Sequence, residues 1–150
     1  MLTCGLNIQN QLFEVFGLYQ ADASENDGMI FSSTSTSGYI GAISDGDVST
    51  TLSAQSLSTP TFFKNGVDAS PTTRDNLHTV YHDGVLNIVG VSGEVNSHVS
   101  WIGFKFWSYG NITTFTSNCN YSEDIVFLSD QSVNRTAIVN DIAGRYGITV

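Results

Sequence analysis

Short runs of alternating or continuous apolar residues recur along the chain, and turn-forming residues bound each of them. The clearest runs are Leu12–Gln20, Val85–Ser92 and Ser100–Trp107. Alternation with a period of two predicts β-strands, and the first run is apolar on both faces, which predicts a strand in the middle of a sheet. Further strands are expected at Met29–Ser32, Tyr39–Ile43, Thr61–Lys64 and Asp124–Ser129.

Turn-forming sequences separate these runs. The Asp-Gly-Asp stretch at 45–47 and the Asn-Gly pair at 65–66 are tight-turn signals. The polar segment Ala21–Gly28 predicts a hairpin loop after the first long strand. Short strands with turn signals about every ten residues are typical of an antiparallel sandwich or jelly roll. The 150 residues, without a linker or composition break, are expected to form a single domain (1–150).

One internal segment departs from the strand pattern. Between Thr72 and His82, apolar residues fall at i, i+3 and i+4 starting from Leu77. This spacing places them on one side of a helix, and Gly84 is a suitable residue to end it. The segment therefore predicts a short helix inside an otherwise β-rich chain.

A second helix is expected at the end of the chain, over Gln131–Arg145. Ser129 or Asp130 is the expected N-cap, and Gly147 suits the position after the last turn. The expected apolar stripe consists of Ile138, Ile142 and Tyr146.

Several segments carry a family resemblance. Thr61–Gly66 (TFFKNG), Thr73–Leu77 (TRDNL) and the His-Asp-Gly at 82–84 resemble the second half of concanavalin A-like, laminin-G-type lectin domains. The end, Asp124–Val150, resembles the closing strand and capping helix of such domains in phage structural proteins and bacterial surface proteins. The resemblance covers residues 12–150 in the order of their elements, and it is specific only in the last 27 residues. It implies an all-β, antiparallel jelly-roll sandwich with one short internal helix and a C-terminal helix.

The resemblance also implies a missing element. Members of that family carry more sequence ahead of the strand at Leu12–Gln20 than this chain does. We therefore expect the chain to lack an N-terminal strand and to leave one sheet edge open. Open edges promote aggregation unless something covers them, so a neighbouring chain is expected to shield this edge. A monodisperse monomer at micromolar concentration would contradict this expectation.

Charge excludes several partner classes. The formal net charge is -9, from 5 Lys and Arg against 14 Asp and Glu. Five scattered cations cannot build the basic patch that nucleic acid or an anionic membrane surface requires. No apolar run is long enough to span a bilayer, and the N-terminus lacks the pattern of a Sec signal. We expect neither nucleic-acid binding nor membrane insertion.

Cysteines and histidines give weak chemical signals. Cys4 and Cys119 are either bridged across the sandwich or two buried thiols, and the second interpretation is favoured. His78 and His82 have the i, i+4 spacing that can place two imidazoles on one metal. Without a third ligand nearby, two solvated histidines on a helix face are favoured. No paired carboxylates lie on one strand, so no enzyme activity is expected.

A calcium site is one candidate for the loop that contains Asp45 and Asp47. Laminin-G-type domains hold Ca²⁺ at the rim of the sandwich, and these carboxylates, like Asn26 and Asp27, supply the oxygens that the ion prefers. Turn chemistry alone accounts for the same residues and is the favoured interpretation. No other cofactor is expected.

The strand around residue 105 provides the candidate binding residues. Ile102, Phe104 and Phe106 alternate with Trp101, Lys105 and Trp107. A lysine within the second row indicates that this row faces water. The two tryptophans stand ~20 Å apart by strand rise, which suits an extended glycan or another subunit. Packing of these tryptophans under the terminal helix or against a partner chain is the favoured alternative to glycan binding.

These features lead to two hypotheses about function. The first is a phage structural or capsid-decoration protein, assembled in the host cytoplasm, that binds capsid or fibre subunits, copies of itself or host glycans. The second is a carbohydrate-binding or adhesion module at a bacterial cell surface. The missing Sec signal favours the first hypothesis.

Overall fold

The computed structural model describes residues 3–8, 12–21, 27–33, 39–54, 57–95, 101–106 and 119–150. These residues form strands that pair antiparallel throughout, together with two helices. The prediction of an all-β chain with one internal and one C-terminal helix is therefore confirmed. The strands make two five-stranded sheets.

The first sheet has the strand order β1-β9-β3-β4-β5. Its strands are β1 (Thr3–Ile8), β9 (Trp101–Phe106), β3 (Asp27–Ser33), β4 (Tyr39–Ser44) and β5 (Ser53–Ala54). The second sheet has the order β10-β2-β8-β6-β7. Its strands are β10 (Cys119–Phe127), β2 (Leu12–Ala21), β8 (Asn87–Val95), β6 (Leu57–Lys64) and β7 (Val67–Asp68).

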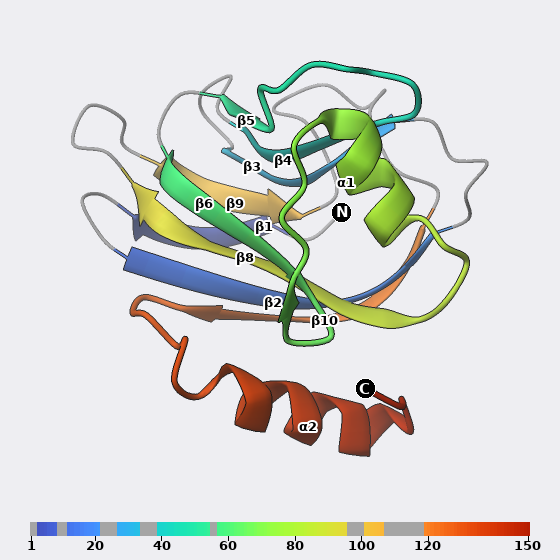
Figure 1. Ribbon diagram of the computed structural model, residues 1–150. Helices are drawn as coiled ribbons and strands as arrows, with labels where there is room; N and C mark the ends of the chain where they lie inside the picture. The colour runs from blue at the N-terminus through green and yellow to red at the C-terminus, as the bar shows by residue number, and fades with distance from the viewer. Residues whose placement is uncertain are drawn as a thin grey trace.

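The two helices lie in different places. Figure 1 shows α2 (Arg135–Tyr146) along the second sheet, on the side away from the first sheet. The other helix, α1 (Arg74–Tyr81), packs against β4. The second sheet therefore has α2 on one face and the first sheet on the other, which explains why its central strands are apolar on both faces.

β2 is the central strand that its sequence predicts. It pairs with β10 on one side and with β8 on the other, and its residues from Phe13 to Tyr19 are all buried. Alternate side chains serve two cores because the strand period is two. On the α2 side, the core consists of Phe16, Leu18, Phe63, Ile88, Val139, Ile142 and Ala143.

Two sequence-based predictions about connections are wrong. Ala21–Gly28 is not a hairpin loop, because β2 and β3 lie in different sheets, so the chain crosses between sheets there. The expectation of a missing N-terminal strand fails as well, since β1 precedes β2 and pairs with β9. The segment TCGLNI has the period-two alternation that predicts a strand, although the family resemblance implied that no strand lies there.

α2 is shorter than predicted. It begins at Arg135, after a turn in which the Asn134 amide donates to the Gln131 carbonyl. Its buried side chains are Val139, Ile142 and Ala143, whereas Tyr146 is 41% exposed. Of the predicted stripe, Ile142 is buried and Ile138 packs against the same core, so only Tyr146 lies outside it. Gly147 follows the helix with φ 66°, a left-handed conformation that suits glycine, as expected.

Tyr81 fixes α1 to the second sheet. Thr73 caps the start of α1 by accepting from the Asn76 amide, and the predicted helix is confirmed. At the other end, the buried Tyr81 hydroxyl lies 3.0 Å from the Phe63 carbonyl and 2.9 Å from the Gly90 carbonyl. One side chain therefore joins α1, β6 and β8.

Tyr81→Phe is expected to lower the free energy of unfolding by about 1–2 kcal/mol, because it removes a buried hydroxyl and leaves carbonyl acceptors unpaired. Urea denaturation measures the change. Tyr146→Phe, at an exposed tyrosine, is the matched control and should change stability by less than about 0.5 kcal/mol. Equal effects of the two changes would contradict the anchoring role of Tyr81.

Candidate functional site

The predicted binding row lies on β9, between β1 and β3. The register places Lys105 opposite Thr3 on β1 and Ser32 on β3, so three polar residues cross the sheet side by side. Trp101 lies opposite Ile8. The side chains of Trp101 and Lys105, and all of Trp107, lie outside the described part of the chain.

The register also places two phenylalanines of β9. Phe104 and Phe106 are one position out of phase with Lys105, and Phe106 pairs with Phe31. The side chains of β9 lie outside the described part of the chain, so the binding row stays a prediction.

The Asp45–Asp47 loop is held by α1. The Asp47 carboxylate lies 3.0 Å from the Arg74 guanidinium and accepts from the Ser49 amide at 2.8 Å. The Gly46 amide in turn donates to Asp75. The Ser49 amide and, after it, Arg74 lower the pKa of Asp47, so its carboxylate is ionised at neutral pH.

A calcium ion at this loop would compete with Arg74 for the Asp47 oxygens. Asp45 is exposed at the turn and adds one carboxylate. Among the described residues, no group of three or more His, Cys, Asp or Glu side chains is placed to hold a metal ion. The calcium site stays a prediction.

The expectation that His78 and His82 are solvated is wrong. Their side chains are 5% and 1% exposed, and their ring centroids are 4.5 Å apart. The Tyr19 hydroxyl lies 2.7 Å from Nε2 of His82. The helix face that carries Leu77 and Tyr81 is the buried face of α1, and His78 shares it. His98 lies outside the described residues.

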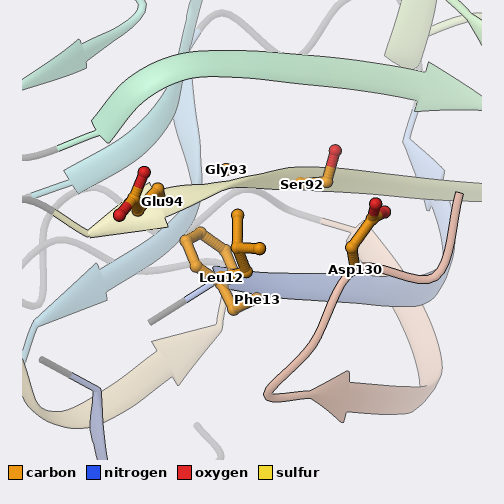
Figure 2. A pocket seen from close by; sticks show the side chains of 6 residues that line it. All are labelled: Leu12, Phe13, Ser92, Gly93, Glu94 and Asp130. Atoms are coloured by element: carbon orange, nitrogen blue, oxygen red, sulfur yellow. The ribbon is translucent and has the colours of Figure 1, made fainter. Parts of the chain in front are cut away.

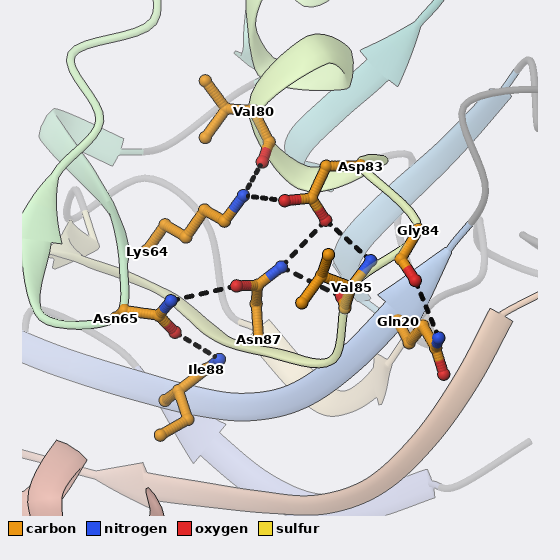
Figure 3. A network of polar contacts seen from close by, with 9 residues as sticks. All are labelled: Gln20, Lys64, Asn65, Val80, Asp83, Gly84, Val85, Asn87 and Ile88. Atoms are coloured by element: carbon orange, nitrogen blue, oxygen red, sulfur yellow. Dashed lines mark hydrogen bonds and ion pairs between the residues drawn. The ribbon is translucent and has the colours of Figure 1, made fainter. Parts of the chain in front are cut away.

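A polar network closes the loop between α1 and β8 (Figure 3). Lys64 donates to the Val80 carbonyl at 2.7 Å and to Asp83 at 2.6 Å. The other Asp83 oxygen accepts from Asn87, which in turn accepts from Asn65. These groups bond one another, which indicates a structural role.

Opposing effects act on the Asp83 carboxyl. Burial raises its pKa, but hydrogen bonds from Lys64, Val85 and Asn87 outweigh burial and leave the pKa below its ordinary value. Asp83 is therefore ionised at neutral pH and acts as the partner of Lys64.

A second polar group fastens the start of α2 to the sheet. Glu14, fully buried on β2, lies 2.6 Å from Nε of Arg135 and accepts from the Gln131 amide at 3.0 Å. The Arg135 guanidinium also stacks over the Phe63 ring at 4.6 Å. The carboxylate thus satisfies two donors that precede or begin the helix.

A small pocket lies beside this ion pair, at the beginning of β2 and near the end of β8 (Figure 2). It measures about 170 Å³ and is lined by Leu12, Phe13, Ser92, Gly93, Glu94 and Asp130. Sequence reasoning missed it because the lining comes from three distant segments. An apolar residue at the exposed start of a central strand is the only local signal.

The two cysteines lie in different sheets. Cys4 is on β1 and pairs with Phe104, whereas Cys119 begins β10 and pairs with Ala21. Their side chains lie outside the described residues, so both interpretations stand.

Comparisons with known proteins identify no relative. No protein-family model, no curated protein and no solved structure matches the chain. Within the described residues, neither helix combines the length and the apolar character needed to cross a membrane.

Proposed function

We propose that the chain is a virion structural or capsid-decoration protein with a concanavalin A-like jelly-roll fold. It presents β9 of the first sheet, with Trp101 and Lys105, and the following residue Trp107 to neighbouring capsid or fibre subunits and to host glycans. The family resemblance of the last 27 residues supports the virion setting.

The arrangement of the helices is the observation that carries this proposal. α2 covers the face of the second sheet that points away from the first sheet (Figure 1). β9 lies inside the other sheet, flanked by β1 and β3. Tryptophan is a frequent anchor of protein interfaces, which supports a role of Trp101 and Trp107 in subunit binding.

Replacing Trp101 with Ala and Lys105 with Glu tests the surface. Removal of an aromatic anchor and reversal of a charge should weaken subunit binding by at least about tenfold. Sedimentation velocity measures self-association, and mass spectrometry of particles purified from the encoding virus measures incorporation. Val133→Ala, at a 90% exposed apolar residue, is the matched control.

Absence of the chain from particles would overturn the virion proposal. Normal incorporation of the double variant, with normal self-association, would remove the β9 face from the interface. A glycan array then separates subunits from sugars: glycan binding that depends on Trp101 supports the sugar-binding part of the proposal, and glycan binding by a chain that is absent from particles favours the adhesion module.

A further inference from the structure

The pocket beside α2 has the charge and shape of a site for one side chain. Leu12, Glu14, Phe16 and Leu18 alternate along β2 and share the face that α2 covers. The cover ends at the Glu14–Arg135 pair. Beyond it, Leu12 remains 50% exposed although it continues the same face.

Strand register places the acidic wall. Glu94 on β8 lies directly opposite Leu12, and Ser92 lies opposite Glu14, so Glu94 and Ser92 belong to the same face. The loop between β10 and α2 adds Asp130. Figure 2 shows Glu94 and Asp130 at opposite ends of the pocket with Leu12 between them.

Neither Glu94 nor Asp130 forms a direct ion pair with another described residue. The Arg135 guanidinium pairs with Glu14 at 2.6 Å, donates to the Ser92 hydroxyl at 3.4 Å and attracts the Asp130 carboxylate more weakly. The Ser132 amide donates to Asp130 at 2.8 Å and is the main reason that the pKa of Asp130 lies below its ordinary value. The Asp130 carboxylate is thus ionised at neutral pH, and Glu94 places a second carboxyl group at the other end of the pocket.

We infer that this pocket binds one basic side chain, arginine or lysine, of a partner protein. Such a side chain packs its methylene stem on Leu12 and directs its cationic head to Glu94 or Asp130. The volume of about 170 Å³ is below the roughly 300–1,000 Å³ of pockets that enclose whole small molecules, and it suits a single side chain.

Two other occupants fit less well. A sugar ring usually stacks on an exposed aromatic face, and Phe13, the aromatic residue of the lining, is 1% exposed. A calcium ion takes six to eight oxygen ligands, whereas the lining offers carboxylates only at its two ends. The inference goes beyond the proposed function, because this pocket lies on the second sheet and its test needs no virus particle.

The test is a titration of the full ¹⁵N-labelled chain with N-acetyl-arginine methylamide, followed by NMR. The backbone amides of Leu12, Gly93 and Asp130 should shift. The citrulline derivative has nearly the same shape without the charge, so it should bind at least about tenfold more weakly. Glu94→Gln and Asp130→Asn should each weaken arginine binding, while Asp141→Asn, an exposed carboxylate on α2, should not.

Equal shifts with arginine and citrulline would overturn the inference. So would the absence of shifts at these amides, or variants of Glu94 and Asp130 that bind as the parent does. Methyl glycosides that shift the same amides, when arginine does not, would assign the pocket to sugars instead. If a variant failed to fold, the comparison of arginine with citrulline on the parent chain would still decide.

Discussion

Glu14→Leu is expected to lower the free energy of unfolding by about 3–5 kcal/mol. The change removes the fully buried carboxylate that Arg135 and the Gln131 amide both bind. The guanidinium, whose side chain is 16% exposed, would then be an uncompensated charge at the edge of the core. Leucine is close to glutamate in volume, so the loss reports the ion pair and not a cavity.

Urea denaturation measures this loss, and hydrogen exchange locates it. The amides of α2 should lose more protection than those of α1, because Glu14 fastens only the start of α2. The combined change Glu14→Leu and Arg135→Leu should recover most of the stability, since an apolar pair has no charge to desolvate.

Asp141→Asn is the control for this experiment. It breaks the exposed i,i+4 pair with Arg145, whose atoms are 3.2 Å apart, and should lower stability by about 0.5 kcal/mol or less. A Glu14→Leu effect as small as that of the control, or a double variant no better than the single one, would contradict the role of Glu14.

Local periodicity predicted most elements of this fold. β2, β8, β9 and α1 follow from residues close together in the sequence, because the spacing of apolar side chains reports which face is buried. The position of β2 in the middle of a sheet followed from its two apolar faces.

Pairing partners and sheet membership could not be predicted in the same way. β2 pairs with β8 and β10, which lie far along the chain, so the segment after β2 crosses to the other sheet. The burial of His78 depends on where α1 packs in the fold. The i, i+4 spacing of His78 and His82 in the sequence does not show whether these side chains are buried. The start of α2 depends on Glu14, a residue more than a hundred positions earlier.

The same distinction between local and long-range information applies to the candidate sites. Trp101 and Lys105 stood out because a single strand carries them. The acidic pocket joins Leu12, Glu94 and Asp130 from three segments, and only the strand register brings them to one face. Sequence alone therefore finds surfaces that one element presents and misses surfaces that several elements build.

Asp124 lies on the inner side of the edge strand β10. Its neighbour Glu123 binds Arg145 of α2, and Ile125 and Phe127 pack on the α2-side core. Strand alternation therefore directs Asp124 to the opposite face, toward the first sheet. Both of its carboxylate oxygens are buried without a hydrogen-bond partner in the described part of the chain.

Asp124→Asn is expected to stabilise the protein at pH 8 and to leave its stability at pH 4 unchanged. Burial first, and then the charge of Glu123, raise the pKa of Asp124 from 3.8 to about 7. Between these values the folded state keeps a proton that the unfolded state has lost, so the stability of the parent chain falls as the pH rises. The gain at pH 8 is at most about 4 kcal/mol.

Urea denaturation of both chains from pH 4 to pH 9 measures this difference. The two curves should separate between pH 4 and pH 7 and run parallel above it, whereas Asp141→Asn should follow the parent throughout. Curves of Asp124→Asn that never separate from the parent would show that the carboxyl titrates normally in the fold.

The same variant tests why an edge strand retains this carboxylate. β10 pairs only with β2 among the described residues, and an inward-facing charge on such an edge opposes pairing with a further strand. A register shift between Tyr121 and Asp124 adds a second irregularity to that edge. Asp124→Asn should therefore be more stable at pH 8 yet associate more readily in light scattering. If Asp124→Asn gained stability without associating, the charge of Asp124 would not be what prevents pairing at β10. The register shift alone would then protect this edge.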